Sequence, residues 1–218
     1  MHLAKVHVFS IKRYQKGAAE RFLEKNEIPF EHSIAVTRDG YKLTMQHLLP
    51  LFSSAERAAF SPRKKSKGTV IFLHGMFESS AMAFSHGTAS LPVTLASSGW
   101  DVYLGNVRGN LYGLGHEKLS PWSDEFWDFS IREHAQEDFP AMVKQVLKET
   151  GRSQIDAVYG TSQGALVALM GIAKNAAALN EAIRLCVAVA PALVLRRPTN
   201  KLVRVVFDTD PAIMGERQ

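Results

Sequence analysis

One pentapeptide has the residue types of nucleophilic catalysis: Gly160-Thr161-Ser162-Gln163-Gly164. It fits the pattern Gly-x-Ser-x-Gly, which requires an apolar strand before the serine and a helix after it. Residues 155–159 and 165–170 meet these two conditions. We therefore expect Ser162 in a strained turn at a helix N-terminus, where free backbone amides favour developing negative charge. Gly160 and Gly164 would let the strand and the helix approach closely. The alternative is a helix start that has this composition by chance.

A second motif, His74-Gly75-Met76, directly follows the apolar run of residues 70–73. In an α/β-hydrolase fold, the loop at this place supplies one amide of the oxyanion hole, and the residue after the nucleophile supplies the other. This assigns the backbone N–H groups of Met76 and Gln163 to the oxyanion hole. We predict that His74 itself is a hydrogen-bonding residue of the loop rather than a base.

The elements that must position these motifs alternate along the chain. Apolar runs predict strands at residues 69–73, 101–104, 155–159 and 183–190. Helical periodicity predicts helices at residues 85–98, 131–150 and 163–179. Such alternation is typical of βαβ units and a mostly parallel sheet. Upstream, residues 1–27 favour helix, and Asp39-Gly40 predicts a hairpin turn between extended segments at 32–37 and 41–49.

A family resemblance covers residues 27 to 191. The chain resembles the acid lipases of the α/β-hydrolase superfamily, which include gastric lipase, lysosomal acid lipase and sterol-ester hydrolases. The stretches that carry the resemblance are 28–32, 36–41, 73–80, 101–110, His116, 119–121, 126–130, Glu133 and 138–141. The resemblance implies an α/β-hydrolase fold and a serine hydrolase of neutral lipid esters, either acylglycerols or sterol esters. Contact with a membrane or lipid-droplet surface is a further prediction.

The resemblance also suggests a division of the chain into four parts. These are a lipase-associated segment with a hairpin (1–60), a basic linker (61–68), a hydrolase core (69–190) and the start of a cap region or tail (191–218). We interpret the basic linker as a solvated loop, since a lone basic run usually is one.

Two departures from the family pattern matter. Thr161 stands where the family commonly has His, which changes the packing behind Ser162 but removes no catalytic atom. The second concerns the triad order of this fold, which is serine, acid, histidine. All eight histidines precede Ser162, and the aspartates after it are Asp208 and Asp210. We therefore interpret the chain as a C-terminally truncated hydrolase that lacks its triad acid and base and is inactive alone.

Two histidines, the last predicted strand and a pair of aspartates have alternative interpretations. His116 and His134 are the candidates for an unusual substitute base, although the family match suggests that His116 holds the loop after the second strand. The strand predicted at 183–190 would leave an unpaired apolar edge, which predicts aggregation. Asp208 and Asp210 are interpreted as part of a solvated turn, because two carboxylates without His or Cys are a poor metal site.

Composition excludes several classes. A single cysteine cannot form a disulfide within the chain, and no apolar run reaches the ~18 residues of a membrane-spanning helix. The net charge of +5 permits nucleic-acid binding, but nothing else in the chain supports it. No Gly-x-Gly-x-x-Gly or Gly-Lys-Ser/Thr loop supports a nucleotide. We predict no cofactor and no metal. The N-terminus does not match a secretory signal, and the sequence leaves the compartment open.

Two functional hypotheses remain. The first is a lipid ester hydrolase that uses Ser162 as its nucleophile. The second is a non-catalytic truncated lipase homologue that binds lipid or a partner, or has no stable fold. The missing histidine and the exposed last strand favour the second hypothesis, whereas the intact serine motif and oxyanion loop favour the first.

Overall fold

The computed structural model describes residues 17–51 and 66–193. The strands of these ranges are β1 (Phe30–Val36), β2 (Tyr41–Leu48), β3 (Thr69–Leu73), β4 (Asp101–Gly105), β5 (Gly115–His116), β6 (Ala157–Thr161) and β7 (Cys186–Val189). The helices are α1 (Ala18–Lys25), α3 (Leu91–Ser97), α4 (Ile131–Glu133), α5 (Phe139–Thr150), α6 (Gln163–Lys174) and α7 (Ala176–Ala182). None of the described helices is long and apolar enough to cross a membrane.

The described strands form one sheet in the order β1-β2-β4-β3-β6-β7, with β5 paired to β2. β1 and β2 are the predicted antiparallel hairpin, and β2 continues antiparallel to β4. β4, β3, β6 and β7 run parallel to one another. The predicted mostly parallel sheet is therefore confirmed, and the N-terminal hairpin extends the same sheet. Because parallel strands end at one edge, the loops after β3, β4 and β6 meet there.

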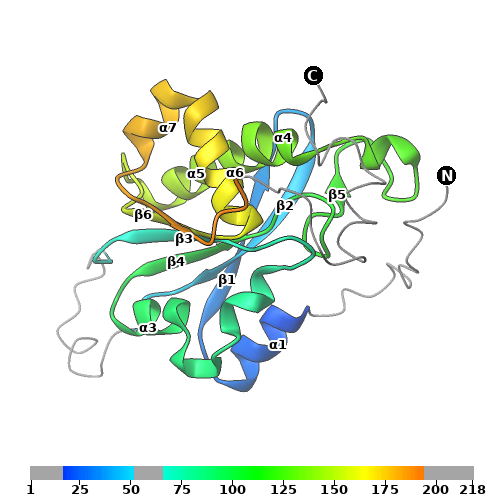
Figure 1. Cartoon of the computed structure of the whole chain (residues 1–218). Helices are drawn as coiled ribbons and strands as arrows, with labels where there is room; N and C mark the ends of the chain where they lie inside the picture. Colours follow the sequence, from blue (N-terminus) through cyan, green and yellow to red (C-terminus); the bar gives the residue numbers. More distant parts are fainter. Residues whose placement is uncertain (1–16, 52–65, 194–218) are drawn as a thin grey trace.

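Helices cover both faces of the sheet, with a hydrophobic core under each set of helices. α5, α6 and α7 lie on one side, whereas α1 and α3 lie on the other (Figure 1). β3 is buried along its whole length, with Ile71 and Leu73 in the core under α5 and α6. Its alternate residues, Val70 and Phe72, belong to the core that α1 and α3 cover. This two-sided burial is why β3 is a continuous apolar run.

The helix predicted at 85–98 is shorter in the structure. It begins at Leu91, and two 3₁₀ turns at 80–84 and 87–89 precede it. Gly87 has a positive φ of 60°, which interrupts helical geometry, and Pro92 sits in the first turn of α3, where its missing N–H costs nothing. The prediction was therefore right about the existence of the helix and wrong about its start.

Other predicted boundaries also shift. The helix predicted at 131–150 contains a π-helical turn at His134–Asp138, and the helix predicted at 163–179 breaks at Asn175 into α6 and α7. The strand predicted at 155–159 is two residues out of place, since the ladder with β3 begins at Ala157 and β6 ends at Thr161. Ile155 forms only an isolated bridge to Ile183. Apolar runs mark burial, whereas the hydrogen-bond partners decide where a strand begins.

β7 ends the sheet within the described part of the chain. It pairs only with β6 there, as the sequence predicted for this edge. Leu185, just before the strand, and Val189, its last residue, are exposed. The strand itself is shorter than expected, covering Cys186–Val189 rather than 183–190. The aspartates Asp208 and Asp210, residues 1–16 of the predicted N-terminal helix, and residues 61–65 of the predicted linker lie outside the described residues.

A buried arginine joins three segments that are distant in sequence. Arg108, in the loop after β4, is 2% exposed. Its backbone N–H and its Nε donate to the Asp138 carboxylate at 2.9 and 2.7 Å, and its two terminal nitrogens donate to Asp39 in the hairpin turn at 2.6 and 2.9 Å. The guanidinium also stacks 3.9 Å above the centre of the Tyr41 ring. Arg108 therefore ties the hairpin and the π-helical turn to the sheet edge.

We expect Arg108→Met to lower the free energy of unfolding by about 3–5 kcal/mol, because Asp138 would remain buried without its counter-ion. Urea denaturation measures the change. The matched control is Arg38→Met, which removes an exposed ion pair with Glu137 and should cost less than about 1 kcal/mol. Equal losses in the two variants would contradict a dominant role for the buried pair.

Candidate active site

Ser162 lies in the turn between β6 and α6, exposed at the carboxyl edge of the sheet. Its φ of 51° and ψ of −114° are unusual for a residue other than glycine, and such strain persists only where the surroundings enforce it. The Ser162 N–H donates to the Val189 carbonyl at 2.9 Å, which anchors the turn to β7. The hydroxyl does not cap α6. The turn therefore presents the oxygen of Ser162 outward at the start of a helix.

The two glycines of the motif sit where no side chain fits. A Cβ on Gly160 would lie 2.6 Å from the Ala165 nitrogen, and a Cβ on Gly164 would lie 2.5 Å from the Leu73 oxygen and 2.6 Å from the His74 oxygen. Both contacts involve backbone atoms, so flexible side chains cannot relieve them. The first turn of α6 thus rests directly on the end of β3, where the second motif begins.

The residues predicted for the oxyanion hole flank this junction. Gln163 is the first residue of α6, so its N–H has no partner within the helix. Met76 lies in the loop after β3, and its N–H donates no hydrogen bond to any described residue. The neighbouring Phe77 has a positive φ of 60° and is 84% exposed, which marks a sharply turned loop. The structure therefore brings both predicted donors to the same edge as Ser162.

His74 is a hydrogen-bonding residue of this loop, as predicted. Its Nε2 accepts from the Asn110 amide at 3.0 Å and from the Val107 N–H at 3.4 Å. Its Nδ1 therefore carries the proton and donates to the Gly75 carbonyl at 2.7 Å. Burial lowers the pKa of His74, which keeps the ring neutral.

Of the two candidate substitute bases, His116 is engaged in other hydrogen bonds and His134 is buried. His116 uses its Nε2 on the Asp39 carbonyl at 2.9 Å, and its Nδ1 accepts the N–H groups of Lys118 and Leu119. It holds the loop after β4, as predicted, and its short strand β5 pairs with β2 rather than with β6. His134 is buried, and neither ring nitrogen has a hydrogen-bond partner among the described residues. Neither imidazole is hydrogen-bonded to Ser162.

Sequence reasoning missed the polar residues that hold the loops of this edge. Asn106, Arg108 and Asp138 all lie in stretches quoted for the family resemblance, yet no partner could be assigned to them. Asn106 and Asp138 are fully buried, and Arg108 is nearly so. For Asn106 and Arg108, the available signal was a polar residue directly after an apolar strand, because buried polar groups require partners.

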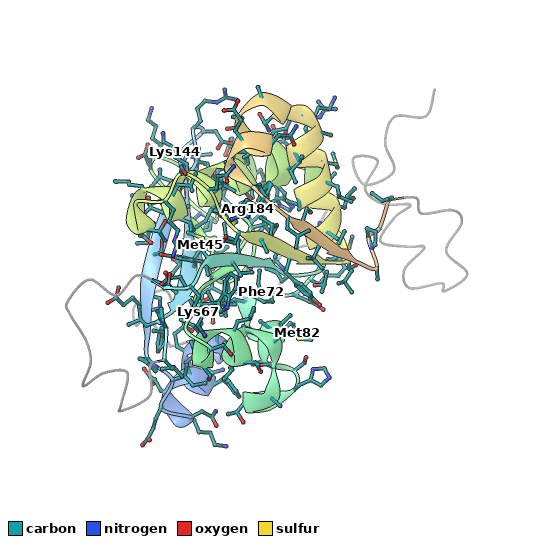
Figure 2. The ribbon with its side chains drawn as sticks, turned by 90° about the vertical axis from the view of Figure 1, so that its left-hand side faces the viewer. Met45, Lys67, Phe72, Met82, Lys144 and Arg184 are labelled. Carbon is teal, nitrogen blue, oxygen red and sulfur yellow. The ribbon has the colours of Figure 1, made fainter. Side chains whose placement is uncertain are left out.

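A cavity of about 340 Å³ lies beside the loop that carries Met76. Its lining includes His74, Glu78 and Thr161, together with the apolar side chains of Phe72 and Met82. Figure 2 shows Phe72 on the same side of β3 as Met82. The described residues thus leave unfilled space next to the serine turn. Thr161 also donates its hydroxyl to the Leu73 carbonyl at 3.4 Å, which joins the residue before Ser162 to β3.

Family models match most of the chain. Residues 68–212 match the family described as alpha/beta hydrolase fold, and residues 19–87 match the partial alpha/beta-hydrolase lipase region. The chain belongs to the alpha/beta-hydrolase fold family. The match to the lipase region covers the N-terminal hairpin and the loop with Met76, so it fits the acid lipases within this family.

Relatives and solved structures agree with this assignment. A tear acid lipase-like protein of Mesocricetus auratus is 38% identical, covering 74% of this chain and 39% of that protein. Lipase member K of Mus musculus is 33% identical, covering 87% of this chain and 46% of that protein. The chain thus spans less than half the length of these relatives. Naproxen esterase from Bacillus subtilis shares the fold, with a TM-score of 0.53 and 14% identity over 87% of this chain and 53% of that chain.

The contact between Gly164 and the end of β3 leads to a testable prediction. Gly164→Ala should lower the free energy of unfolding by at least about 2 kcal/mol, although alanine normally stabilises a helix relative to glycine. The control is Gly87→Ala, where a Cβ meets nothing within 4 Å and only the positive φ costs about 1 kcal/mol. Chemical denaturation compares the two variants. A stabilised Gly164→Ala variant would show that α6 can move away from β3.

The buried His134 leads to a prediction about the pH dependence of stability. Burial, and secondarily the charge of Arg108, lowers the pKa of His134 to about 4. The unfolded chain, with its ordinary pKa near 6.5, binds the proton more readily. Stability that is present above pH 6.5 is therefore lost as the pH falls towards 4, by up to about 3 kcal/mol.

Urea denaturation between pH 7 and pH 4 tests this assignment. His134→Leu should flatten the acid side of the stability profile, whereas His86→Leu, at an exposed histidine, should leave it unchanged. A profile that keeps its full slope in His134→Leu would assign the acid sensitivity to other groups.

Proposed function

We propose that this chain carries the nucleophile half of an ester hydrolase of the acid-lipase type. Ser162 attacks the ester carbonyl, and the N–H groups of Met76 and Gln163 hold the oxyanion that forms. The observation that carries the proposal is the strained, outward-facing Ser162 at the start of α6, packed against the loop with Met76. Backbone N–H donors next to a helix N-terminus stabilise the negative charge that develops on the substrate oxygen.

We infer neutral lipid esters, acylglycerols or sterol esters, as the substrate class. The lipase names of the relatives support this class. Large apolar side chains are also exposed on the loops after β3, β4 and β5, namely Phe77, Leu111 and Trp122. Such side chains favour contact with a membrane or lipid-droplet surface, and this contact remains a prediction.

The reaction requires a base that takes the proton of Ser162, because a serine hydroxyl is a weak nucleophile alone. No histidine follows Ser162 in the sequence, and His74, His116 and His134 are not hydrogen-bonded to it. We therefore propose that a base and an acid from outside these 218 residues complete the triad, and that the chain alone hydrolyses esters slowly. Without triad partners, only the contribution of the oxyanion hole and of binding remains.

A fluorophosphonate probe followed by intact-mass and peptide analysis tests the nucleophile. We expect one adduct, on Ser162, that Ser162→Ala abolishes and Ser98→Ala, at another exposed serine, leaves in place. The reaction should be slow, and a complementing C-terminal polypeptide that supplies the base should accelerate it. Adducts spread over several serines, or none after prolonged incubation, would remove Ser162 from the mechanism.

The second candidate is a non-catalytic lipase homologue with a binding role or none. No histidine of the described residues is hydrogen-bonded to Ser162, which favours this candidate. The two candidates predict different masses for the native protein in its source. Peptides beyond Gln218 and a species well above 24.1 kDa would support the hydrolase. A stable species of 24.1 kDa without ester hydrolysis would support the non-catalytic role.

A further inference from the structure

A single oxygen atom links the two ends of the loop that carries Met76, directly at one end and through Asn110 at the other. At the far end, the Ser80 N–H donates to Asn106 Oδ1 at 2.9 Å. At the near end, the Asn110 amide donates to the same Oδ1 at 2.9 Å and to Nε2 of His74 at 3.0 Å. Asn106 thus closes a hydrogen-bonded ring around residues 74–80.

Asn106 is itself immobilised from the opposite side. It is fully buried directly after β4, and its amide nitrogen donates to the Thr44 carbonyl at 2.9 Å and to Gln46 Oε1 at 3.3 Å, both in β2. The Gln46 amide in turn donates to the Glu20 carboxylate of α1 at 2.7 Å. Because a carboxylate accepts only, every amide in this series has one allowed orientation, and Oδ1 of Asn106 must face the loop.

The same series sets the protonation of His74. With Asn110 and the Val107 N–H both donating to Nε2, the imidazole proton lies on Nδ1 and bonds the Gly75 carbonyl, the residue before Met76. Within the loop, the Gly75 N–H donates to Glu78 Oε2 at 2.8 Å. The Gly75 carbonyl, which shares its peptide group with the Met76 N–H, is thus held by His74, and His74 is linked through Asn110 to Asn106.

We propose that Asn106 is the positioning residue of the oxyanion hole, which acts through Asn110, His74 and Ser80 to hold the Met76 N–H towards the ester oxygen. The inference rests on the proposed function for its catalytic meaning. We call the contacts that run from Ser80 through Asn106 and Asn110 to His74 the clamp. The clamp does not depend on the proposed function, because it consists of hydrogen bonds between buried or half-buried groups. Misplacement of a catalytic donor by about 1 Å can cost ~100-fold in rate. The Met76 N–H must therefore be held in one position, and Asn106, with its single allowed orientation, can provide that.

Amide hydrogen exchange of the full chain, resolved by NMR, tests the clamp. In Asn106→Ala, the amides of Gly75 and Glu78, which Asn106 does not touch, should exchange roughly tenfold faster or more, while those of β6 keep their rates. Asn175→Ala, which removes a different asparagine contact at the end of α6, should leave both amides unchanged. Equal acceleration in β6, or a change at Ser80 alone, would overturn the proposal.

The milder Asn110→Ala variant keeps the test decisive if Asn106→Ala does not fold. It should accelerate exchange at Gly75 but not at Ser80, because the bond from Ser80 to Asn106 remains. The nitrogen-15 shifts of the His74 ring should also move away from a pure Nδ1–H tautomer, while those of His116, held as the Nε2–H tautomer, stay fixed. An unchanged Gly75 amide and His74 ring would contradict the clamp.

The rate of phosphonate labelling at Ser162 connects the clamp with catalysis, since the probe develops charge on an oxygen in the same hole. We expect Asn106→Ala to label about tenfold or more slowly than the unmodified chain, and Asn175→Ala to match that chain. If hydrogen exchange shows that the loop is loosened in Asn106→Ala but Ser162 labels as fast as in the unmodified chain, the positioning role is overturned. If the unmodified chain does not label at all, the proposed function fails, and hydrogen exchange alone decides the clamp.

Discussion

The close approach of α6 to the end of β3 is the constraint on which the site depends. At Gly164, a single added carbon would lie 2.5 Å from the Leu73 oxygen, so the helix can start there only on a residue without a side chain. Ser162, with its positive φ, stands two residues before this contact, and the contact places the first turn of α6 next to the loop after β3. The nucleophile and both predicted oxyanion donors are thus assembled by one backbone-to-backbone contact.

Buried polar side chains fix the positions of the loops around this contact. Asn106 and Arg108 follow the same strand two residues apart, and they fix different loops. Asn106 holds the loop with Met76 against β2, whereas Arg108 holds the hairpin turn and the π-helical turn through Asp39 and Asp138. Each would be costly to bury without its partners, so the hydrogen bonds that satisfy these residues also specify a single loop arrangement.

Much of the fold could be predicted from the sequence, because local patterns report local structure. The hairpin at Asp39-Gly40, the buried strand β3 and the strand–turn–helix around Ser162 all appear where periodicity and glycine placement predict them. The errors occur at boundaries. The start of α3, the break at Asn175 and the offset of β6 depend on hydrogen-bond partners from other segments, which a hydrophobic pattern does not reveal.

By itself, the sequence determined the family, the chain order of the motifs and the absence of a histidine after Ser162, since these are properties of residue type and spacing. Only the tertiary structure decided what the polar residues do. His74 and His116 are occupied by loop hydrogen bonds, and His134 is buried without a hydrogen-bond partner among the described residues. Asn106 contacts Ser80 and Thr44, which lie 26 and 62 residues away in the sequence. The physical reason is that a hydrogen bond requires approach to about 3 Å, and only the packing of the whole sheet brings such distant groups together.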